Sequence, residues 1–370
     1  MSIFNSIQEF DHEQVVLCSD KSVGLKAIIA IHSTTLGPAL GGTRMWTYNT
    51  DEDAIKDALR LSRGMTYKSA LAGLNLGGGK AVVIGNPKTD KSEAMWRAYG
   101  RYVEGLAGRY ITAEDVGTST KDMEYIRMET KYVSGLSEKI GGSDDPSPVT
   151  ALGVYVGMKA AMKDLTGSDS LTGKSVMVQG VGHVGQYICE HLYKEKAKIY
   201  VSDIYEDRLK EMVTKYGVEV INQQDKVFDI DADIFCPSAL GAIINDNTIN
   251  RLKFKIIAGA ANNVLLDEKK HGQMLYDKGI LYAPDYVINA GGVINVYYEL
   301  EGYQRERALR HAEGIYDTLL DIFATSKKDK IPTYVASNKL AEERLEKVGH
   351  IKQKYVGSSK YSGRFSELFK

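Results

Sequence analysis

The sequence contains little cysteine and little proline. Its three cysteines, Cys18, Cys189 and Cys236, lie far apart, with no CxxC motif and no histidine cluster at metal-ligand spacing. This pattern favours a reducing, cytoplasmic location and argues against a structural zinc site or another metal site. The 7 prolines stand against 36 glycines, which is typical of many tight turns between regular elements rather than of disorder.

An excess of charge of one sign and a long apolar run are missing as well. The 47 Lys and Arg residues nearly balance the 48 Asp and Glu residues, and the signs are mixed along the chain. No net field therefore attracts nucleic acid. The longest uncharged stretch, residues 27–43, is shorter than the ~20 apolar residues that span a bilayer. Because the first residues lack a basic segment followed by an apolar core, we expect neither a signal peptide nor a membrane span.

The length of 370 residues exceeds the ~250–300 residues at which one hydrophobic core stops growing, so it predicts two domains. The boundary is expected within residues 141–148, where a Gly- and Pro-rich stretch leads into a helix that Ser147 can cap. We expect a first domain over residues 1–145, completed by a C-terminal helix over about residues 331–370, and a second domain over residues 146–330.

Local patterns in the first half predict both strands and helices. Residues 23–32 alternate and then run apolar, and residues 80–85 and 109–115 are short apolar segments; all three are typical of strands. Three consecutive glycines come directly before the segment at residues 80–85. Thr50 and Asp53 have the spacing of a capping box, which predicts a helix start there.

The second half alternates between strand-like and helix-like segments. Strands are predicted at residues 175–180, 198–203, 231–237, 255–262 and 279–292, and the chain from about residue 305 onward is predicted to be helical. Strands that alternate with helices in this way indicate a parallel, doubly wound sheet of the Rossmann type.

A glycine fingerprint joins the first of these strands to the helix that follows. Gly180 allows the tight turn, Gly182 lets the backbone approach a pyrophosphate, and Gly185 lets the helix pack closely on the strand. Asp203 ends the next strand, about 20 residues later, where a carboxylate binds the adenosine ribose and repels a 2′-phosphate. NAD is therefore the expected cofactor, bound by Gly180, Gly182, His183, Val184, Gly185 and Asp203. The alternatives are a structural glycine turn or a site for another adenosine ligand.

Two lysines interrupt apolar segments of the first half. Lys68 lies between Tyr67 and Ser69, and Lys80 lies between the triple glycine and Ala81. A charged group in an apolar segment is costly unless it is paired or its pKa is shifted. One ammonium group can bind a substrate carboxylate, and its charge favours the neutral form of the other, which then serves as a general base. Asp115, at the end of its strand, is placed to carry protons, although an Asp that caps the turn before the next glycine fits the pattern equally well.

Six long strings together identify a family resemblance. They are LGPALGGTRMW (36–46), GMTYKSALAGLNLGGGKAVVIG (64–85), GRYITAEDVGT (108–118), PSPVTALGVY (146–155), APDYVINAGGVINV (283–296) and IPTYVA (331–336). The chain resembles the glutamate/leucine/phenylalanine/valine dehydrogenase superfamily from about Ile3 to Arg344, and its leucine-specific members most closely. The resemblance implies an α/β fold with a Rossmann-type NAD-binding domain, an α/β domain for substrate binding and oligomerisation, and a cleft between the two.

The same resemblance implies a role for individual residues. Lys68 would bind the substrate carboxylate, Lys80 would be the base that activates water, and Asp115 would shuttle protons at the amino group. Thr150, Asn262 and Asn289 match positions that face the nicotinamide or the substrate, and Gly41 and Gly42 match the backbone of the substrate pocket. Members of the superfamily form large homo-oligomers, commonly octamers. The tail beyond Glu346 resembles nothing specific in it.

Apolar pocket positions predict a branched aliphatic L-amino acid as the substrate, leucine above valine or isoleucine. Glutamate-specific relatives bind the side-chain carboxylate with polar residues at the positions of Leu40 and Val296, so a glutamate carboxylate would be left unpaired here. Ala113 and Val293 restrict an aromatic side chain, a weaker inference because one methylene contributes only ~1–3 kcal/mol. Thr43 stands where leucine-specific relatives often have Ala, and it is expected to adjoin the pocket.

Other functions fit the sequence less well. Phenylalanine or valine oxidation by the same mechanism is the main alternative. Oxidation of a 2-hydroxy acid would need an Arg and a His in a comparable motif, which the chain does not present. A catalytically silent NAD-binding regulatory homologue would have no need to retain Lys68, Lys80 and Asp115 together.

Overall fold

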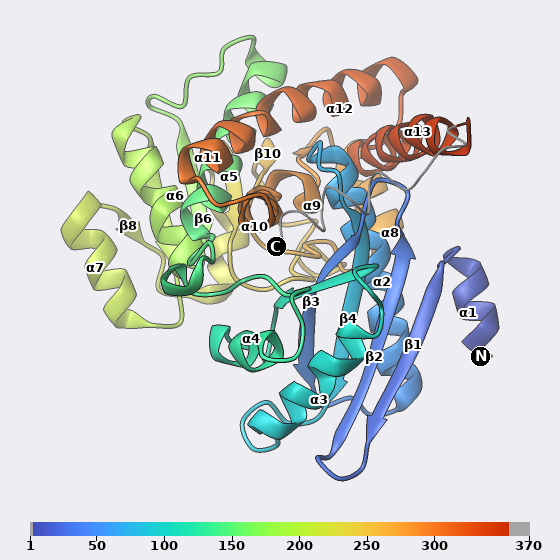
Figure 1. The fold of residues 1–370 in the computed structure, drawn as a ribbon. Coiled ribbons are helices and arrows are strands. Elements are labelled where there is room, and N and C mark those ends of the chain that lie inside the picture. The colour runs from blue at the N-terminus through green and yellow to red at the C-terminus, as the bar shows by residue number, and fades with distance from the viewer. Residues whose placement is uncertain (1–2, 355–370) are drawn as a thin grey trace. The chain divides into compact units, whose positions relative to one another are not determined.

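A computed structural model of the chain describes residues 3–354 and divides into two compact units. The first unit consists of Met1–Asp144, Val296–Gln304 and Ala341–Lys370, and the second of Asp145–Asn295 and Arg305–Leu340. Two of the boundaries fall inside helices, α10 (Gly291–Leu300) and α13 (Thr333–Lys354). Each unit combines a sheet with helices (Figure 1), so the predicted α/β class is confirmed.

The first unit is built on a five-stranded sheet with the order β1-β2-β4-β3-β5. Its strands are β1 (Gln14–Asp20), β2 (Leu25–Ser33), β3 (Ala39–Trp46), β4 (Gly77–Ile84) and β5 (Tyr110–Glu114). Its helices include α1 (Ile3–Glu9), α2 (Asp51–Leu71), α3 (Glu93–Glu104) and α4 (Thr120–Arg127), with a 3-10 turn at Glu138–Ile140. β2 pairs antiparallel with β1 and β4, whereas β3 is parallel to β4 and β5.

Both faces of this sheet are covered by helices. On one face, buried residues of α3 such as Trp96 and Tyr99 pack with Ile29, Met45 and Val83 of the strands. On the other face, Ala54, Ile55, Ala58 and Leu59 of α2 pack against Ile28, Ala30 and Val82. Because the two faces of each strand are buried, β2 and β4 read as nearly continuous apolar runs.

Helix α2 begins and packs as its sequence requires. Thr50 is its N-cap and accepts a hydrogen bond from the Asp53 N–H, as predicted. Farther along, a Cβ at Gly78 would lie 2.1 Å from the Thr66 nitrogen, so only glycine lets α2 approach β4 this closely. The triple glycine is therefore part of β4, which starts three residues before the predicted strand.

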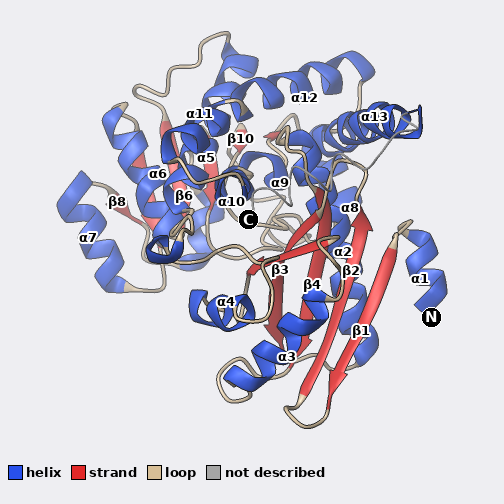
Figure 2. Cartoon of the chain, in the orientation of Figure 1, coloured by secondary structure: helices blue, strands red, loops and turns tan. Residues whose placement is uncertain are grey.

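The second unit contains a six-stranded sheet with the order β11-β10-β9-β6-β7-β8, in which every pairing is parallel. Its strands, each shorter than β1 to β4 of the first unit (Figure 2), are β6 (Ser175–Gln179), β7 (Lys198–Ser202), β8 (Glu219–Val220), β9 (Ile234–Pro237), β10 (Ile256–Ile257) and β11 (Leu281–Tyr282). The helices are α5 (Ser147–Thr166), α6 (His183–Lys194), α7 (Glu206–Tyr216), α8 (Glu268–Asp277), α9 (Asp285–Ile288), α11 (Arg305–Glu313) and α12 (Ile315–Asp329), with a 3-10 helix at Gln224–Asp229. The predicted doubly wound parallel sheet is confirmed.

Some local predictions were wrong. Ser147 is the first residue of α5 rather than its cap; Pro146 occupies the N-cap position, without a side-chain hydrogen bond. The predicted strand at residues 279–292 is only Leu281–Tyr282, because Asp285–Ile288 and the residues from Gly291 onward are helical. Within residues 3–354, no helix is both long and apolar enough to cross a membrane. Of the tail beyond Glu346, residues 355–370 lie outside the described part of the chain.

Candidate active site

Lys80 and Asp115 meet in the first unit, as their proposed partnership requires. Lys80 is on β4 and Asp115 directly follows β5, and their strands are separated by β3. The two backbones are therefore two strand spacings apart, about 10 Å. The Lys80 Nζ nevertheless lies 2.5 Å from Asp115 Oδ2. Gly42 of β3 leaves the space for this contact, because a Cβ there would lie 2.8 Å from the Asp115 Cβ.

Burial sets the electrostatics of this pair. Lys80 is only 6% exposed, and burial lowers the pKa of its ammonium group, while Asp115 opposes that shift. Burial by itself would raise the pKa of the Asp115 carboxyl, but Lys80 and Arg44 hold it below its usual range. Asp115 is thus kept ionised beside a lysine whose neutral form is favoured, the combination that a general base and its proton carrier need.

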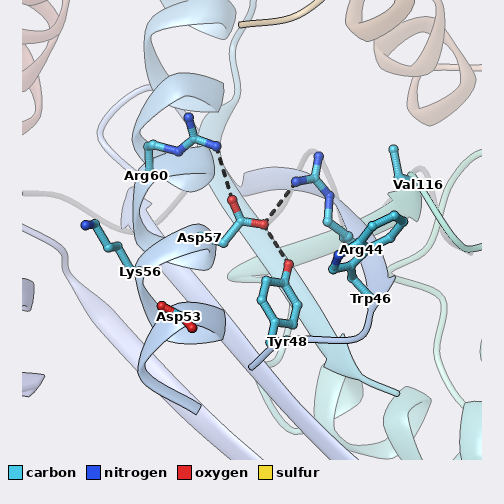
Figure 3. Close-up of a pocket in the computed structure, with 8 residues that line it drawn as sticks. All are labelled: Arg44, Trp46, Tyr48, Asp53, Lys56, Asp57, Arg60 and Val116. Atoms are coloured by element: carbon cyan, nitrogen blue, oxygen red, sulfur yellow. Dashed lines mark hydrogen bonds and ion pairs between the residues drawn. The ribbon is translucent and has the colours of Figure 1, made fainter. Parts of the chain in front are cut away.

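A second ion pair extends from Asp115 towards α2. Arg44, on β3, donates from Nε to Asp115 Oδ2 at 3.2 Å and from Nη1 to Asp57 Oδ2 at 3.0 Å. Tyr48 donates to the same Asp57 oxygen at 2.6 Å, and Arg60 lies 3.2 Å from Asp57 Oδ1. Figure 3 shows the Asp57 carboxylate between Arg60 on one side and Arg44 and Tyr48 on the other.

These residues line a hollow of about 450 Å³ in the first unit. Its lining consists of Arg44, Trp46, Tyr48, Asp53, Lys56, Asp57, Arg60 and Val116. Trp46 and Val116 are each 51% exposed. Through Arg44 and Asp57, the series of ion pairs that begins at the buried Lys80 therefore reaches a hollow that is open to solvent.

Lys68 lies in the last turn of α2 and is half-buried. The residues around it are held by the part of α13 from Ala341 onward, which belongs to the same unit. Tyr67 donates to Glu342 Oε1 at 2.6 Å, and Arg344 donates to the carbonyls of Ser69 and Ala70. The chain segment on either side of Lys68 is thereby fixed by residues 274 or 275 positions later in the sequence.

The predicted pocket residues of β3 and β5 are neighbours in the sheet. Leu40, 2% exposed, pairs with Gly78 on one side and Ile111 on the other, and Gly42 pairs with Ala113. A Cβ at Gly41 would lie 1.6 Å from the Gly79 carbonyl oxygen. Gly41 is therefore required by its close approach to the backbone of β4, and Gly42 is required by the position of Asp115.

The expectation that Thr43 adjoins the pocket does not hold for its side chain. Thr43 is 0% exposed, and its hydroxyl bonds to Tyr99 Oη at 2.7 Å and Thr112 Oγ1 at 2.6 Å. Side chains alternate along a strand, so Thr43 points to the α3 side of the sheet while Arg44 points to the α2 side. Val293 and Val296, the other predicted pocket residues, are three positions apart on α10.

The glycine fingerprint of the second unit has the expected strand–turn–helix context. It follows β6 and opens α6, and Gly180 has φ +95°, a conformation that favours glycine. A Cβ at Gly185 would lie 2.1 Å from the Gly180 oxygen. At Gly182, by contrast, the nearest described atom to such a Cβ is Arg208 Nη1 at 3.9 Å. No described atom therefore crowds the backbone at Gly182, directly before the first N–H groups of α6, those of His183 and Val184, and a helix N-terminus of this kind suits a phosphate group.

Asp203 lies beside this turn and binds two backbone groups. Its Oδ2 accepts from the Val181 N–H at 2.8 Å and its Oδ1 from the Tyr205 N–H at 2.9 Å. Arg208 Nη1 is 3.9 Å from Asp203 Oδ2. Asp203 thus fixes the fingerprint loop, in addition to the ribose contact that the sequence predicts.

The three positions predicted near the nicotinamide are all in the second unit, and two of them, Asn262 and Asn289, are hydrogen-bonded to each other. Asn289 donates from Nδ2 to Asn262 Oδ1 at 2.7 Å and to the Ala260 oxygen at 3.0 Å. Thr150, in the first turn of α5, packs against Gly291 and Gly292, since a Cβ at Gly292 would lie 3.4 Å from Thr150 Oγ1. The hydroxyl of Thr150 donates to the Pro146 oxygen at 3.0 Å.

Comparison with known proteins identifies the family. Residues 12–132 match the model described as Glu/Leu/Phe/Val dehydrogenase, dimerisation domain. Residues 141–206 and 200–347 match the model described as Glutamate/Leucine/Phenylalanine/Valine dehydrogenase. The chain belongs to the Glu/Leu/Phe/Val dehydrogenase family. The resemblance inferred from the sequence strings is thereby confirmed.

Several members of the Glu/Leu/Phe/Val dehydrogenase family are similar over nearly the whole chain. Leucine dehydrogenase of Thermoactinomyces intermedius is 61% identical over 346 residues, 94% of each chain. Leucine dehydrogenase of Geobacillus stearothermophilus is 58% identical, again over 94% of each chain. The crystal structure of L-tryptophan dehydrogenase from Nostoc punctiforme has a TM-score of 0.84 at 48% identity and covers 94% of this chain and 99% of that one.

The sequence analysis missed three charged residues of these sites. Arg44 lies two positions after Gly42 and therefore on the same side of β3; this alternation could have predicted that Arg44 lies near Asp115. Asp57 carries no such signal, because it is one of several acidic residues in the first half of α2. Arg208 lies five residues after Asp203, in α7, rather than directly after the carboxylate.

Proposed function

We propose that the chain is an NAD-dependent dehydrogenase of branched-chain aliphatic L-amino acids, with L-leucine as its main substrate, and that it releases the 2-oxo acid and ammonia reversibly. The observation that carries this proposal is the buried Lys80–Asp115 contact at 2.5 Å. Substantial identity to leucine dehydrogenases over 94% of the chain supports the choice of substrate.

The roles of the three polar residues follow from their chemistry. Lys68 binds the substrate carboxylate as a cation. Asp115 takes a proton from the substrate ammonium group, so that the amine can become an iminium when hydride leaves Cα. Lys80, in its neutral form, takes a proton from water as the water oxygen bonds to Cα. Asp115 then returns its proton to the nitrogen, the C–N bond of the carbinolamine breaks, and the hydroxyl proton passes to the departing ammonia, which leaves the 2-oxo acid.

The second unit fits a nicotinamide dinucleotide, which when bound supplies the acceptor for the hydride. The uncrowded backbone at Gly182 and the N-terminus of α6 suit the pyrophosphate. NAD is favoured over NADP because Asp203 repels a 2′-phosphate. Arg208 offsets this repulsion only weakly, since it lies 3.9 Å away and its side chain is 41% exposed. Thr150, Asn262 and Asn289 would face the nicotinamide end.

Apolar pocket residues support the substrate class. Leu40 and Ala113 are 2% and 8% exposed, and Val293 and Val296 are aliphatic. A glutamate side chain among them would leave a carboxylate unpaired, at a cost of about 4 kcal/mol. The distinction from phenylalanine is smaller, and the similarity to a tryptophan dehydrogenase makes an aromatic substrate the second candidate.

Assembly and location belong to the same proposal. A homo-oligomer is supported by the dimerisation-domain model that matches residues 12–132, and an octamer is the size that the family resemblance implies. A cytoplasmic location is supported by the three cysteines, all buried and free.

The experiment that tests the proposal is NAD and NADP reduction by the purified protein at mildly alkaline pH. The substrates are L-leucine, L-valine, L-isoleucine, L-phenylalanine, L-tryptophan and L-glutamate, and the matched control is Lys80→Met, which removes the amine and keeps the apolar stem. Turnover of branched substrates with NAD that is lost in Lys80→Met is the expected result. A preference for an aromatic substrate would refute the pocket argument, and NAD binding without any turnover would favour a silent regulatory homologue.

A further inference from the structure

The Asp115 oxygen that contacts Lys80 is shared with a second cation. Asp115 Oδ2 lies 2.5 Å from Lys80 Nζ and accepts from Arg44 Nε at 3.2 Å. Arg44 is itself held in place by α2, because its Nη1 donates to Asp57 Oδ2 at 3.0 Å. A carboxyl group turns about its Cβ–Cγ bond with little resistance, so the Arg44 contact restricts the orientation of the Asp115 carboxyl group beside the lysine.

We propose that Arg44, anchored by Asp57, is a positioning residue that fixes the Asp115 carboxylate on Lys80 and keeps Lys80 available as a base. This inference rests on the proposed function, in which Asp115 gains and loses a proton in every cycle. When Asp115 is protonated, its attraction to Lys80 weakens. The Arg44 bond then preserves the orientation of the carboxyl group until the proton leaves.

The balance of charge around Lys80 supports the same role. Arg44 contacts the same Asp115 oxygen as Lys80. Its positive charge therefore lies close to the amine and disfavours the protonated form of Lys80. Consistently, Arg44 lowers the pKa of Lys80, and Asp57 raises it.

Other ionisable groups near Lys80 and Arg44 do not reverse the direction in which Arg44 shifts the pKa of Lys80. Tyr48 donates to Asp57, and its pKa is raised by burial. On β5, burial raises the pKa of Tyr110 to about 12 and that of Glu114 above its usual range, and Asp115 adds to both shifts. The two tyrosines are therefore neutral at the pH of the assay, and Glu114 is the remaining carboxylate on the same strand.

The test is the pH dependence of kcat/KM in three variants. Arg44→Gln removes the charge of Arg44. The rising limb of the profile, where kcat/KM increases with pH, should shift to higher pH by about one unit. At a fixed pH below this limb, kcat/KM should therefore fall roughly tenfold. Arg44→Lys keeps the charge and should restore the position of the limb, while kcat falls several-fold because the two-armed contact is lost. Asp57→Asn should move the limb in the opposite direction, to lower pH.

A matched control separates this role from general stability. Arg60 contacts the same Asp57, but its side chain is 55% exposed, so Arg60→Gln should leave the limb within about 0.3 pH units. Thermal unfolding of each variant shows whether it is folded. An unshifted limb in folded Arg44→Gln, or an equal shift in Arg60→Gln, would overturn the inference.

A second readout does not depend on turnover. The rate at which acetic anhydride labels Lys80, followed by mass spectrometry over a pH series, gives the titration of the amine directly. Arg44→Gln should shift that titration to higher pH. If the wild-type protein oxidises no amino acid, the proposed function fails, yet the labelling still decides whether Arg44 controls Lys80.

Discussion

Arg344 joins the end of the described chain to the end of α2, and its removal provides a quantitative test of the fold. Its guanidinium group donates to the carbonyl oxygens of Ser69, Ala70 and Leu74, the last at 3.0 Å. The first two carbonyls belong to the last turn of α2, where the partial negative charge of the helix dipole favours a cation. This turn also carries Lys68.

The expected loss follows from these contacts. Hydrogen bonds from a charged donor contribute about 1.5–3 kcal/mol each, and a cation at a helix C-terminus adds about 0.3–1 kcal/mol. Burial lowers the pKa of Arg344, and this desolvation cost offsets part of the gain. We expect Arg344→Met to lower the free energy of unfolding of the first unit by about 3 kcal/mol. For a unit of this size the midpoint would fall by roughly 6–12 °C.

The assay is urea and thermal unfolding followed by circular dichroism, with Lys347→Met as the matched control. Lys347 lies on the same helix, its side chain is 76% exposed, and it pairs with Glu343 at 3.6 Å, so its replacement should change stability by less than about 0.5 kcal/mol. Arg344→Met should also raise KM for the amino acid more than it lowers kcat, because the Lys68 turn is loosened. Equal stability of the two variants would refute the reasoning.

Two further predictions concern acid stability and the cofactor site. His12 and His32 are buried with their rings 4.9 Å apart, and burial lowers the pKa of each to about 4. In the unfolded chain the same histidines bind protons near pH 6.5. The free energy of unfolding should therefore fall as the pH drops from 6.5 to 4, by up to about 3 kcal/mol per histidine. Urea unfolding at pH 7 and 5 should therefore show a smaller acid loss in His32→Asn than in the wild type, and an equal loss would contradict the assignment. In the second unit, Gly182→Ala should keep the thermal midpoint but weaken NAD binding about tenfold or more, whereas Gly185→Ala should also unfold at lower temperature, because its Cβ would lie 2.1 Å from the Gly180 oxygen. Calorimetric titration with NAD checks both variants, and unchanged affinity in Gly182→Ala would show that the pyrophosphate does not pass this position.

The sequence by itself determined the features whose causes lie within a few neighbouring residues. Thr50 caps α2 because the hydroxyl and the N–H that it binds are three residues apart. The turn at Gly180 needs a positive φ, and Gly185 must let α6 approach that turn, so the fingerprint is encoded within a single strand–turn–helix segment. Alternating strands and helices then gave the parallel order of the second sheet.

Only the tertiary structure decided which distant segments meet. β3 was not predicted as a strand, because its two glycines lack any propensity for it; pairing with β4 and β5 holds it in place. That pairing puts Arg44 beside Asp115, Lys80 within 2.5 Å of the same carboxylate, and Thr43 in the core. The contacts of Asp57 with Arg44 and of Arg344 with α2 likewise join segments that share no local signal, since side-chain direction depends on strand register and helix packing rather than on neighbours in the sequence.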